Sequence, residues 1–482
     1  MSSTLTQPAP ILTDAGTAAS VAVVGGGLSG LAAACALSEA GYRVTLFEKR
    51  PYLGGRASSY EHPGTGEVVD NCQHILLGCC TNLVDFYGRL GVQDKIRWYD
   101  RLTFMLPGGR ASQIGASGWP APFHASPSFV RFGLLSLADK LAIGRAMLTL
   151  MPRVPADGDT SFLEWLRRHG QTKLAIDRFW APVLVSALNE ELDRISVAYG
   201  GMVFRDAFLK SAAAGRMGVP TVPLSELYAA SADYIQERGG QVHLRASVEG
   251  FTPADDHVIV SANGEEIVFD YMISAVPFSG LNRILPHSSD SEPIREQLTH
   301  FTSSPITGIH FWFDREVTQL DHAVLLDRTI QWMFQKSRIL QGRNGSPDAP
   351  LAAGSYLELV VSSSKSLVNV ARNEILELAL RELGEFFPAT KEARVLKSTV
   401  VKEVHATFSP APGLERHRPT PLTPWPRVFL SGDWTATGWP ATMEGAVRGG
   451  YITAQVLANT RGDDARFLVP DLAPRGLMRF FK

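Results

Sequence analysis

Short apolar runs and longer amphipathic stretches alternate along the chain, and the first of them predict a strand, a helix and a second strand. Residues 21–24 and 43–47 are apolar runs of strand length, and residues 31–40 between them have a helical composition. This order predicts a βαβ unit over about residues 21–60. A further strand, loop and helix are expected over residues 68–87.

Helical periodicity dominates residues 125–215. Two of the expected helices cover residues 136–148 and 161–169, and each begins with a serine followed three residues later by an acidic residue. In the second helix this residue is Glu164, which completes a capping box. In the first helix it is Asp139, which forms a weaker variant of the same motif.

Strand signals return in the second half of the chain. Apolar runs within 241–275 and an alternating stretch at 307–313 predict strands, and residues 367–387 predict a long helix. Towards the end of the chain, residues 427–431 predict a buried strand and residues 442–457 a helix.

Two domains are expected, because 482 residues exceed the roughly 250–300 at which a single core stops growing. The pattern divides them into alternating pieces. The expected boundaries are a disordered leader at 1–19, a nucleotide-binding domain at 20–99, 216–295 and 401–460, a substrate domain at 100–215 (helical) and 296–400 (sheet plus helix), and a tail at 461–482.

Composition limits the possible classes of protein. The chain is 45% hydrophobic and 20% charged, as in ordinary globular proteins. Its net charge of −2 provides no electrostatic case for nucleic acid binding. Residues 1–20 lack the basic start of a signal peptide, and no apolar stretch reaches the ~18 residues needed to span a bilayer. The cysteines, Cys35, Cys72, Cys79 and Cys80, fit neither a disulfide framework nor a zinc site, which favours a reducing cytoplasmic location.

A glycine motif follows the first strand. Gly25 permits a tight turn, Gly27 lets the backbone approach a pyrophosphate, and Gly30 lets the helix pack closely on the strand. The free N–H groups of the helix N-terminus, at Leu28 and Ser29, then face the pyrophosphate. These features predict a dinucleotide-binding turn.

The second strand ends in Glu48, which is followed by Lys49. An acidic side chain at the end of this strand accepts hydrogen bonds from both hydroxyls of an adenosine ribose. A free 2′-hydroxyl is therefore expected, and we include both residues among the candidate cofactor contacts.

Three further segments favour FAD over NAD. Gly54, Gly55 and Arg56 allow a second close backbone approach and place a cation beside a diphosphate. The strand at 427–431 leads to Gly432 and Asp433, which suits a carboxylate that accepts from ribityl hydroxyls. The helix that follows is expected to direct its N-terminus at the edge of the flavin that gains negative charge on reduction. The candidates there are Met443, Glu444 and Ala446.

These motifs resemble the flavin amine oxidase and carotenoid desaturase superfamily. Within it, Val69–Gly78 and Gly432–Val447 resemble the squalene-associated branch, the hydroxysqualene dehydroxylases of bacterial hopanoid and squalene synthesis. Cys72 departs from the pattern, because the family has glycine in the motif Asp-Asn-Gly-Gln-His.

The resemblance implies an α/β fold, with a Rossmann-like FAD-binding domain of the amine oxidase-like (GR2) type and a discontinuous α+β substrate domain. Val248 would then contact adenine, although an ordinary buried strand valine is equally consistent with the sequence. The implied partners are a hydrophobic isoprenoid substrate, an external electron donor and a membrane surface, since the substrate partitions into lipid.

The implied reaction delivers hydride from reduced FAD to hydroxysqualene, with loss of water to give squalene. Because hydroxide is a poor leaving group, a general acid is needed. The candidates are His74, Asp70 and Glu444. His74 is preferred for its pKa near neutrality, although a histidine simply bonded to backbone is the commoner case.

Other interpretations remain open. A carotenoid-type desaturase shares the fold and the cofactor but moves electrons in the opposite direction. An amine oxidase usually needs a lysine facing the flavin, and the predicted flavin-facing segments contain none. A non-enzymatic FAD-binding escort protein would show no flavin redox change with any isoprenoid.

A hydrocarbon substrate implies an apolar channel that holds it and a protein surface that contacts the membrane. Residues 179–185 are poor in polar groups and are a candidate wall of a substrate channel. Residues 473–482 are basic and apolar, as expected of an interfacial anchor, although a tail docked on its own protein fits equally well. Residues 126–152 form a second basic and apolar region.

Overall fold

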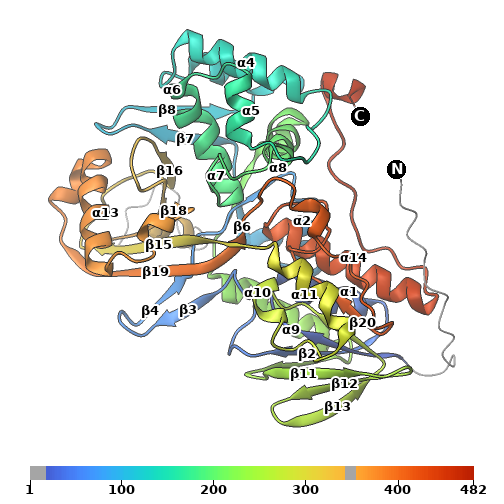
Figure 1. Cartoon of the computed structure of the whole chain (residues 1–482). Coiled ribbons are helices and arrows are strands. Elements are labelled where there is room, and N and C mark those ends of the chain that lie inside the picture. The colour runs from blue at the N-terminus through green and yellow to red at the C-terminus, as the bar shows by residue number, and fades with distance from the viewer. Residues whose placement is uncertain (1–17, 342–353, 482) are drawn as a thin grey trace.

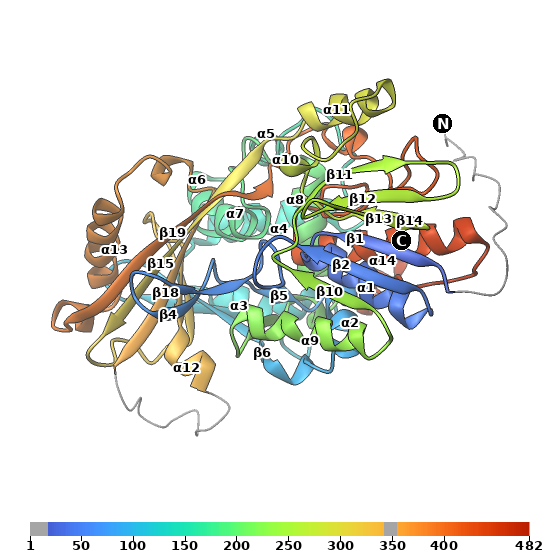
Figure 2. The ribbon, with the colours of Figure 1, turned by 90° about the horizontal axis from the view of Figure 1, so that it is seen from below.

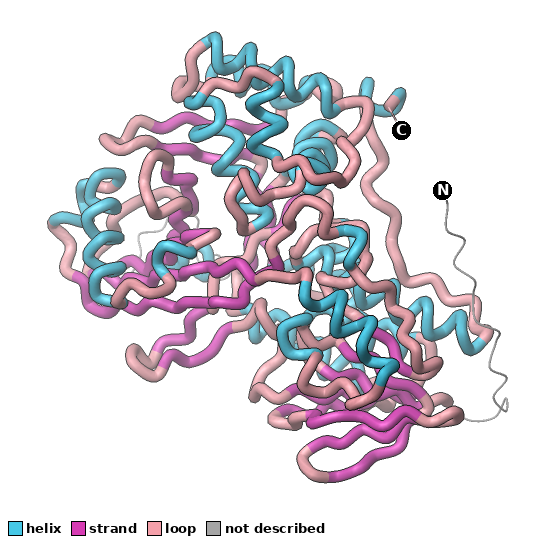
Figure 3. The backbone as a smooth tube through the Cα atoms, in the orientation of Figure 1, coloured by secondary structure: helices cyan, strands magenta, loops and turns pink. Residues whose placement is uncertain are grey.

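The computed structural model describes residues 18–341 and 354–481 (Figure 1). Most of the predicted leader at 1–19 therefore lies outside the described residues. Figures 1 and 2 show two parts, one built around β1, β2 and β10 and the other around β15, β18 and β19. Strands gather at the centre of each part and helices cover them (Figure 3).

A parallel five-stranded sheet forms the centre of the first part. Its order is β10-β2-β1-β14-β20, and every neighbouring pair is parallel. The strands are β1 (Ser20–Val24), β2 (Arg43–Glu48), β10 (Gln241–Leu244), β14 (Tyr271–Ser274) and β20 (Val428–Leu430). They come from three stretches that are far apart in the sequence. The sheet is complete only when β20 pairs with β14.

Helix α1 (Leu28–Glu39) connects β1 to β2 and is almost entirely buried. Its small residues allow α14 (Met443–Arg461) to pack directly on it. A Cβ added at Gly450 of α14 would lie 2.3 Å from the Ser29 carbonyl oxygen, so only glycine permits this approach. The contact holds the last helix of the chain against the first.

Smaller elements surround this sheet. An antiparallel sheet of β11 (Val248–Pro253), β12 (Val258–Ala262) and β13 (Glu265–Phe269) packs through the apolar cluster that contains Phe47. The others are β3 (Ser59–His62) with β4 (Glu67–Asp70), the sheet of β5 (Leu76–Leu77), β9 (Met217–Pro220) and β6 (Ile96–Tyr99), and helices α2 (Thr81–Arg89), α9 (Leu224–Gln236), α10 (Phe278–Leu281) and α11 (Glu292–Thr299).

A seven-stranded sheet with the order β19-β15-β18-β17-β16-β7-β8 forms the second part. One face packs on α13 (Arg372–Phe386) and the other on a helical layer. The strands are β7 (Arg101–Met105), β8 (Ala111–Gly115), β15 (Ser303–Phe313), β16 (His322–Leu325), β17 (Trp332–Gln335), β18 (Ser355–Ser362) and β19 (Val395–Phe408). Residues 100–215, expected to be helical, thus begin with two strands that complete this sheet.

The helical layer comprises α3 (Ser126–Arg131), α4 (Leu137–Leu150), α5 (Phe162–Arg168), α6 (Lys173–Ala175), α7 (Ala181–Leu188) and α8 (Val197–Val203); α12 (Lys336–Gln341) follows β17. The helix starts at Ser136 and Ser161 are confirmed, but the order of their caps is reversed. Ser136 and Asp139 form the complete capping box, whereas Ser161 only accepts from the Glu164 N–H. The shorter aspartate reaches back to the Ser136 N–H at 2.8 Å.

These observations confirm the predicted fold class, a mixed α/β fold with a Rossmann-like domain and a substrate domain. None of the described helices combines the length and the apolar composition needed to cross a bilayer.

Two glycine substitutions test the packing of α14 on α1. Gly450→Ala forces a methyl group against the Ser29 carbonyl and should destabilise the protein by about 1–3 kcal/mol. Gly144→Ala in α4 meets nothing within 4 Å and should stabilise it by up to ~1 kcal/mol. Thermal unfolding of the two variants measures the difference. Equal midpoints would contradict the close-packing argument.

Candidate functional site

The turn between β1 and α1 has the geometry of a dinucleotide cradle. Gly25 adopts φ +110°. A Cβ at Gly30 would lie 1.9 Å from the Gly25 carbonyl oxygen, so α1 starts in direct contact with the turn. At Gly27, in contrast, the nearest atom to an added Cβ is the Gly55 Cα at 3.9 Å. Gly27 therefore borders open space on the side where a pyrophosphate would meet the start of α1.

Glu48 lies buried at the end of β2, beside this turn. Its carboxylate accepts from the Gly26 N–H at 2.7 Å and from the Arg50 N–H at 2.8 Å. Both bonds fix the carboxylate next to the glycine turn, as an acceptor for ribose hydroxyls requires. The Gly54 N–H donates to the Gly26 carbonyl at 2.8 Å, which brings the second glycine pair against the first.

Arg56 contacts a carboxylate at this site. Its guanidinium is 2.5 Å from the Asp433 carboxylate, and it also donates to the Ala406 carbonyl at 3.2 Å. The sequence predicted Arg56 beside a diphosphate and Asp433 beside ribityl hydroxyls. The structure brings these two candidates together, and Asp433 is nearly buried whereas Arg56 stays one-third exposed.

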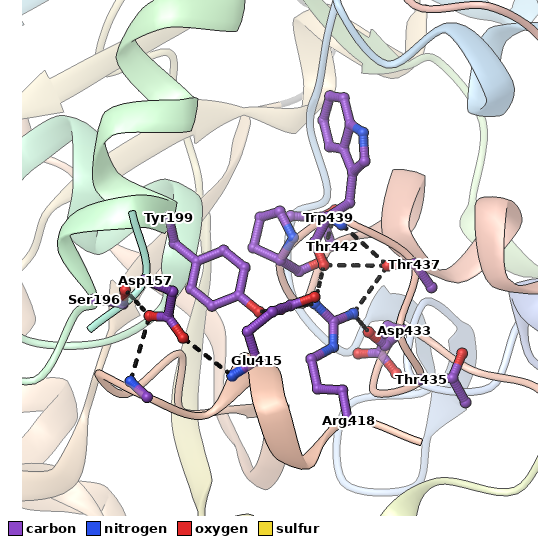
Figure 4. A network of polar contacts seen from close by, with 12 residues as sticks. Asp157, Ser196, Tyr199, Glu415, Arg418, Asp433, Thr435, Thr437, Trp439 and Thr442 are labelled. Atoms are coloured by element: carbon purple, nitrogen blue, oxygen red, sulfur yellow. Dashed lines mark hydrogen bonds and ion pairs between the residues drawn. The ribbon is translucent and has the colours of Figure 1, made fainter. Parts of the chain in front are cut away.

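The loop after β20 is held by a buried arginine that the sequence analysis missed (Figure 4). Arg418 donates to the carbonyl oxygens of Asp433 and Trp439, at 2.7 and 2.8 Å, and to the Thr437 hydroxyl at 2.9 Å. It also donates to the Tyr199 hydroxyl of α8 at 2.7 Å. A side chain at Gly432 would collide with the ring of Trp434, so this turn is tightly constrained from both sides.

The N-terminus of α14 faces the same region. Thr442 caps it by accepting from the Gly445 N–H. The Glu444 carboxylate does not face a ligand but accepts from the N–H groups of Asn82 and Leu83, the free donors at the start of α2. Burial raises the pKa of Glu444, although these bonds oppose it. Glu444 thus joins α2 to α14, which makes it a poor candidate for the general acid.

His74, the preferred acid, is bonded to backbone. Its Nδ1 lies 2.7 Å from the Cys72 carbonyl oxygen. Burial lowers its pKa, so the ring is neutral at pH 7 and Nδ1 carries the hydrogen. This geometry does not favour a proton donor. The family has glycine at the position of Cys72. The backbone of Cys72 is not left-handed, so this position does not require glycine.

Asp70 belongs to a buried cluster rather than a turn cap. It accepts from the Ser59 hydroxyl at 2.5 Å and from the Lys336 ammonium at 2.7 Å. Lys336 also donates to the Gln73 side chain at 2.8 Å and lies 3.4 Å from Glu358. The sequence argument against an amine oxidase was that no lysine lies in the flavin-facing segments. Those segments indeed contain no lysine, but Lys336, at the start of α12, contacts Asp70 and Gln73 of one of them through space.

The remaining candidates lie around the same cradle. Leu28 and Ser29 begin α1 and are buried, and the Ser29 hydroxyl is 2.6 Å from that of Ser431. Lys49 is exposed after β2, Val248 is half-buried at the start of β11, and Ala446 lies in the first turns of α14.

Part of the predicted channel wall borders a cleft of about 960 Å³. Ala181, Pro182 and Val185 line it, but charged side chains such as Asp177, Arg178 and Arg328 line it too, so it is not a purely apolar channel. Trp180, which was included in the predicted wall, is fully buried instead.

Direct contacts join the first glycine turn to Glu48, to the second glycine pair and to α14, an arrangement that suits a bound dinucleotide. The family model described as flavin containing amine oxidoreductase matches residues 28–458. The chain belongs to this family. FAD is therefore its cofactor, and the chain is an FAD-dependent oxidoreductase.

Known proteins agree with this assignment. A 15-cis-phytoene desaturase of Synechococcus elongatus is 28% identical over 473 residues, covering 91% of this chain and 95% of the relative. A probable zeta-carotene desaturase of the same organism is 26% identical over 479 residues, covering 91% and 98%. Among solved structures, an oxidoreductase from Methanosarcina mazei has a TM-score of 0.69 at 18% identity, covering 89% of this chain and 98% of its own, which shows the shared fold.

Gly27→Val tests the cradle. The added side chain has room within the protein but projects to where the pyrophosphate would lie. The variant should fold with an unfolding midpoint close to that of the flavin-free wild type, yet retain no FAD. Absorbance of the purified protein and thermal unfolding measure the two properties. Normal flavin content would refute the assignment of this turn.

Proposed function

We propose that this oxidoreductase acts on a long acyclic isoprenoid and that its reaction is the dehydroxylation of hydroxysqualene. The substrate class is supported by the relatives, which are named for phytoene and zeta-carotene. The reaction is supported by this chain's own residues. Val69–Gly78 and Gly432–Val447 carry the resemblance to the squalene-associated branch, and they lie next to each other at the site.

The contact between these segments is the observation that carries the proposal. Leu77 of the first segment and Trp439 of the second pack against the same small apolar cluster, which is centred on Cys79. Glu444 of the second segment holds the start of α2, three residues further along the chain from the first. Both segments therefore shape the same wall of the flavin region.

Bound FAD, when reduced, supplies the hydride for this reaction. The protein must exclude water, hold the hydrocarbon and provide one proton for the leaving hydroxyl.

Desaturation of a carotenoid-type substrate is the second candidate, and the named relatives favour it over dehydroxylation. It uses the same cofactor with electrons moving from substrate to flavin. Both relatives are named for desaturation and match this chain at only 28% and 26% identity. At this distance their likeness supports the class of substrate better than it supports a particular reaction.

An anaerobic single-turnover experiment separates the two reactions. The flavin of the purified protein is reduced, hydroxysqualene is added, and the oxidised-flavin absorbance and squalene are followed together. Dehydroxylation predicts reoxidation with one squalene formed per flavin. A flavin that stays reduced would contradict it. Reduction of oxidised FAD by phytoene would then establish desaturation, and no change with either substrate would favour an escort protein.

We also propose that a surface of the helical layer contacts a lipid bilayer. The C-terminal segment docks on its own protein, since the Leu477 N–H donates to the Ala121 carbonyl at 2.9 Å and Met478 is buried. Phe480 nevertheless stays 79% exposed. Exposed apolar side chains lie in the segments 119–148 and 477–480, which the hydrogen bond from Leu477 joins: Trp119, Phe123, Val130, Leu137, Leu141, Leu148, Leu477 and Phe480.

Basic residues accompany this apolar surface, namely Arg131, Lys140, Arg145, Arg475 and Arg479. Leu137, Leu141 and Leu148 share one face of α4, because they follow helical spacing. Exposed apolar groups beside cations are the composition of an interfacial contact with anionic lipid.

Single substitutions that introduce a negative charge test this contact. Leu141→Glu and Phe480→Glu each remove apolar area that the bilayer would bury, and each adds a negative charge that anionic lipid repels. Each should therefore lower binding to anionic vesicles about tenfold or more. Vesicle co-sedimentation measures the bound fraction. Val268→Glu, at a 61% exposed position on β13, is the matched control and should bind like the wild type. Equal losses in all three variants would contradict a localised surface.

A further inference from the structure

A buried group of ionisable side chains lies between the seven-stranded sheet and the Asp70–His74 segment. His310 of β15 and Glu358 of β18 are directly paired across the two strands, so their side chains share one face. Both are fully buried. Lys336, which follows β17, reaches the same place and is 2% exposed. Asp70 closes the group from the opposite side.

Neighbouring backbone places this group against the flavin-facing segment. A Cβ added at Gly308, two residues before His310, would lie 3.3 Å from the Asn71 carbonyl oxygen and 3.8 Å from the Cys72 Cα. The same position is 3.4 Å from His310 Nε2. The sheet therefore touches the segment directly, without an intervening layer.

The polar groups of this cluster are unequally satisfied. Asp70 accepts from Ser59 and Lys336, and also from the Leu224 N–H at 3.3 Å. The Glu358 carboxyl is only weakly satisfied within the described residues, by the Lys336 ammonium at 3.4 Å and by the Gln73 backbone. His310 Nε2 has no hydrogen-bond partner among these residues, whereas its Nδ1 lies 2.9 Å from the Tyr356 hydroxyl. Two buried polar groups are thus left with capacity for a ligand.

Charge balance decides which carboxyl carries the proton. One ammonium faces two carboxyls in a buried site, where two carboxylates repel each other. Burial alone would raise the pKa of Asp70, but Lys336 and the hydrogen bonds lower it. Burial and the Asp70 carboxylate raise the pKa of Glu358 to about 8, against the opposing effect of Lys336. Asp70 is consequently the anion and Glu358 the neutral acid at pH 7.

Other ionisable groups around Glu358 do not compete for this role. Burial lowers the pKa of His310 to about 3, so it is neutral. Burial raises the pKa of Tyr356 and of the Cys72 thiol well above their usual values, so both keep their protons throughout the neutral range. Lys336 remains charged, since its two carboxyl neighbours outweigh burial and raise its pKa.

We propose that Glu358 is the proton donor of this enzyme, and that Asp70 and Lys336 are positioning residues. The Asp70 carboxylate repels a second negative charge on Glu358, and Lys336 holds Asp70 as the anion. The inference rests on the proposed dehydroxylation. In that step the Glu358 proton forms an O–H bond with the leaving hydroxyl as the C–O bond breaks. Water leaves, and hydride takes its place on the carbon. The new Glu358 carboxylate is stabilised by Lys336 until it regains a proton from solvent.

Glu358→Gln tests the donor, because glutamine keeps the shape of the neutral acid but has no transferable proton. The variant should retain FAD and the wild-type unfolding midpoint, while squalene formation in a single turnover falls by about 10² or more. Glu190→Gln is the matched control, since Glu190 is likewise fully buried and paired with a lysine, Lys365. It should convert hydroxysqualene at the wild-type rate.

Two readouts examine Glu358 further: the first reports its protonation state, and the second reports its role, because a merely structural carboxyl would leave the pH profile of the rate unchanged. Infrared spectra of the wild type at pH 7 should show the C=O stretch of a buried protonated carboxyl, which Glu358→Gln lacks and Glu190→Gln retains. The wild-type rate should fall as pH rises through about 8, because the donor ionises. Asp70→Asn removes the repelling carboxylate, so this fall should move to lower pH.

The outcomes distinguish the two proposals. A Glu358→Gln variant with the wild-type rate and pH profile, or a wild type without the protonated carboxyl band, would overturn the assignment of Glu358. A wild type that forms no squalene from hydroxysqualene would overturn the proposed function instead.

Discussion

The direct contact between α14 and α1 is the constraint on which the flavin site depends. Gly450 lets α14 approach the Ser29 carbonyl, and a Cβ at Gly449 would lie 2.5 Å from the Gly432 carbonyl. One short stretch of helix therefore fixes both the first glycine turn and the loop after β20. The Ser29–Ser431 contact and the Arg56–Asp433 ion pair reinforce the same junction. Together they assemble a single cradle from opposite ends of the chain.

Buried charged side chains hold the loop after β20 and the start of α2. Arg418 is buried, and its guanidinium pairs with the Glu415 carboxylate at 2.9 Å and donates to carbonyl and hydroxyl oxygens from α8 and from the Asp433–Trp439 loop. Glu444 accepts from the N–H groups at the start of α2. Such groups are costly to bury unless each is paired, so they define one geometry for the loops that they connect. Lys336 differs, because its two carboxyl neighbours cannot both be ionised cheaply, and this imbalance favours a proton on Glu358.

The cofactor half of the fold was predictable from sequence because its signals are local. Gly25–Gly30 and Glu48 are close in sequence, and the strand and helix near Gly432 have clear periodicity. Strands β7 and β8 were missed, since each is only five residues long and their pairing is visible only in the sheet. His310, Lys336 and Glu358 were missed for a related reason. Each sits in or beside an ordinary alternating strand, and only strand register brings them together.

The order of strands in the five-stranded sheet has a consequence for how the protein is made. Strands β1 and β2 are synthesised well before β20 and α14, which complete the sheet and cover α1. Until then the apolar surface of α1 has no final partner, and the flavin cradle lacks one wall. Native contacts of such long sequence separation are slow to form, and chains that wait for them expose aggregation-prone surface. A complete flavin cradle in this fold must therefore wait until α14 has been synthesised and has packed on α1.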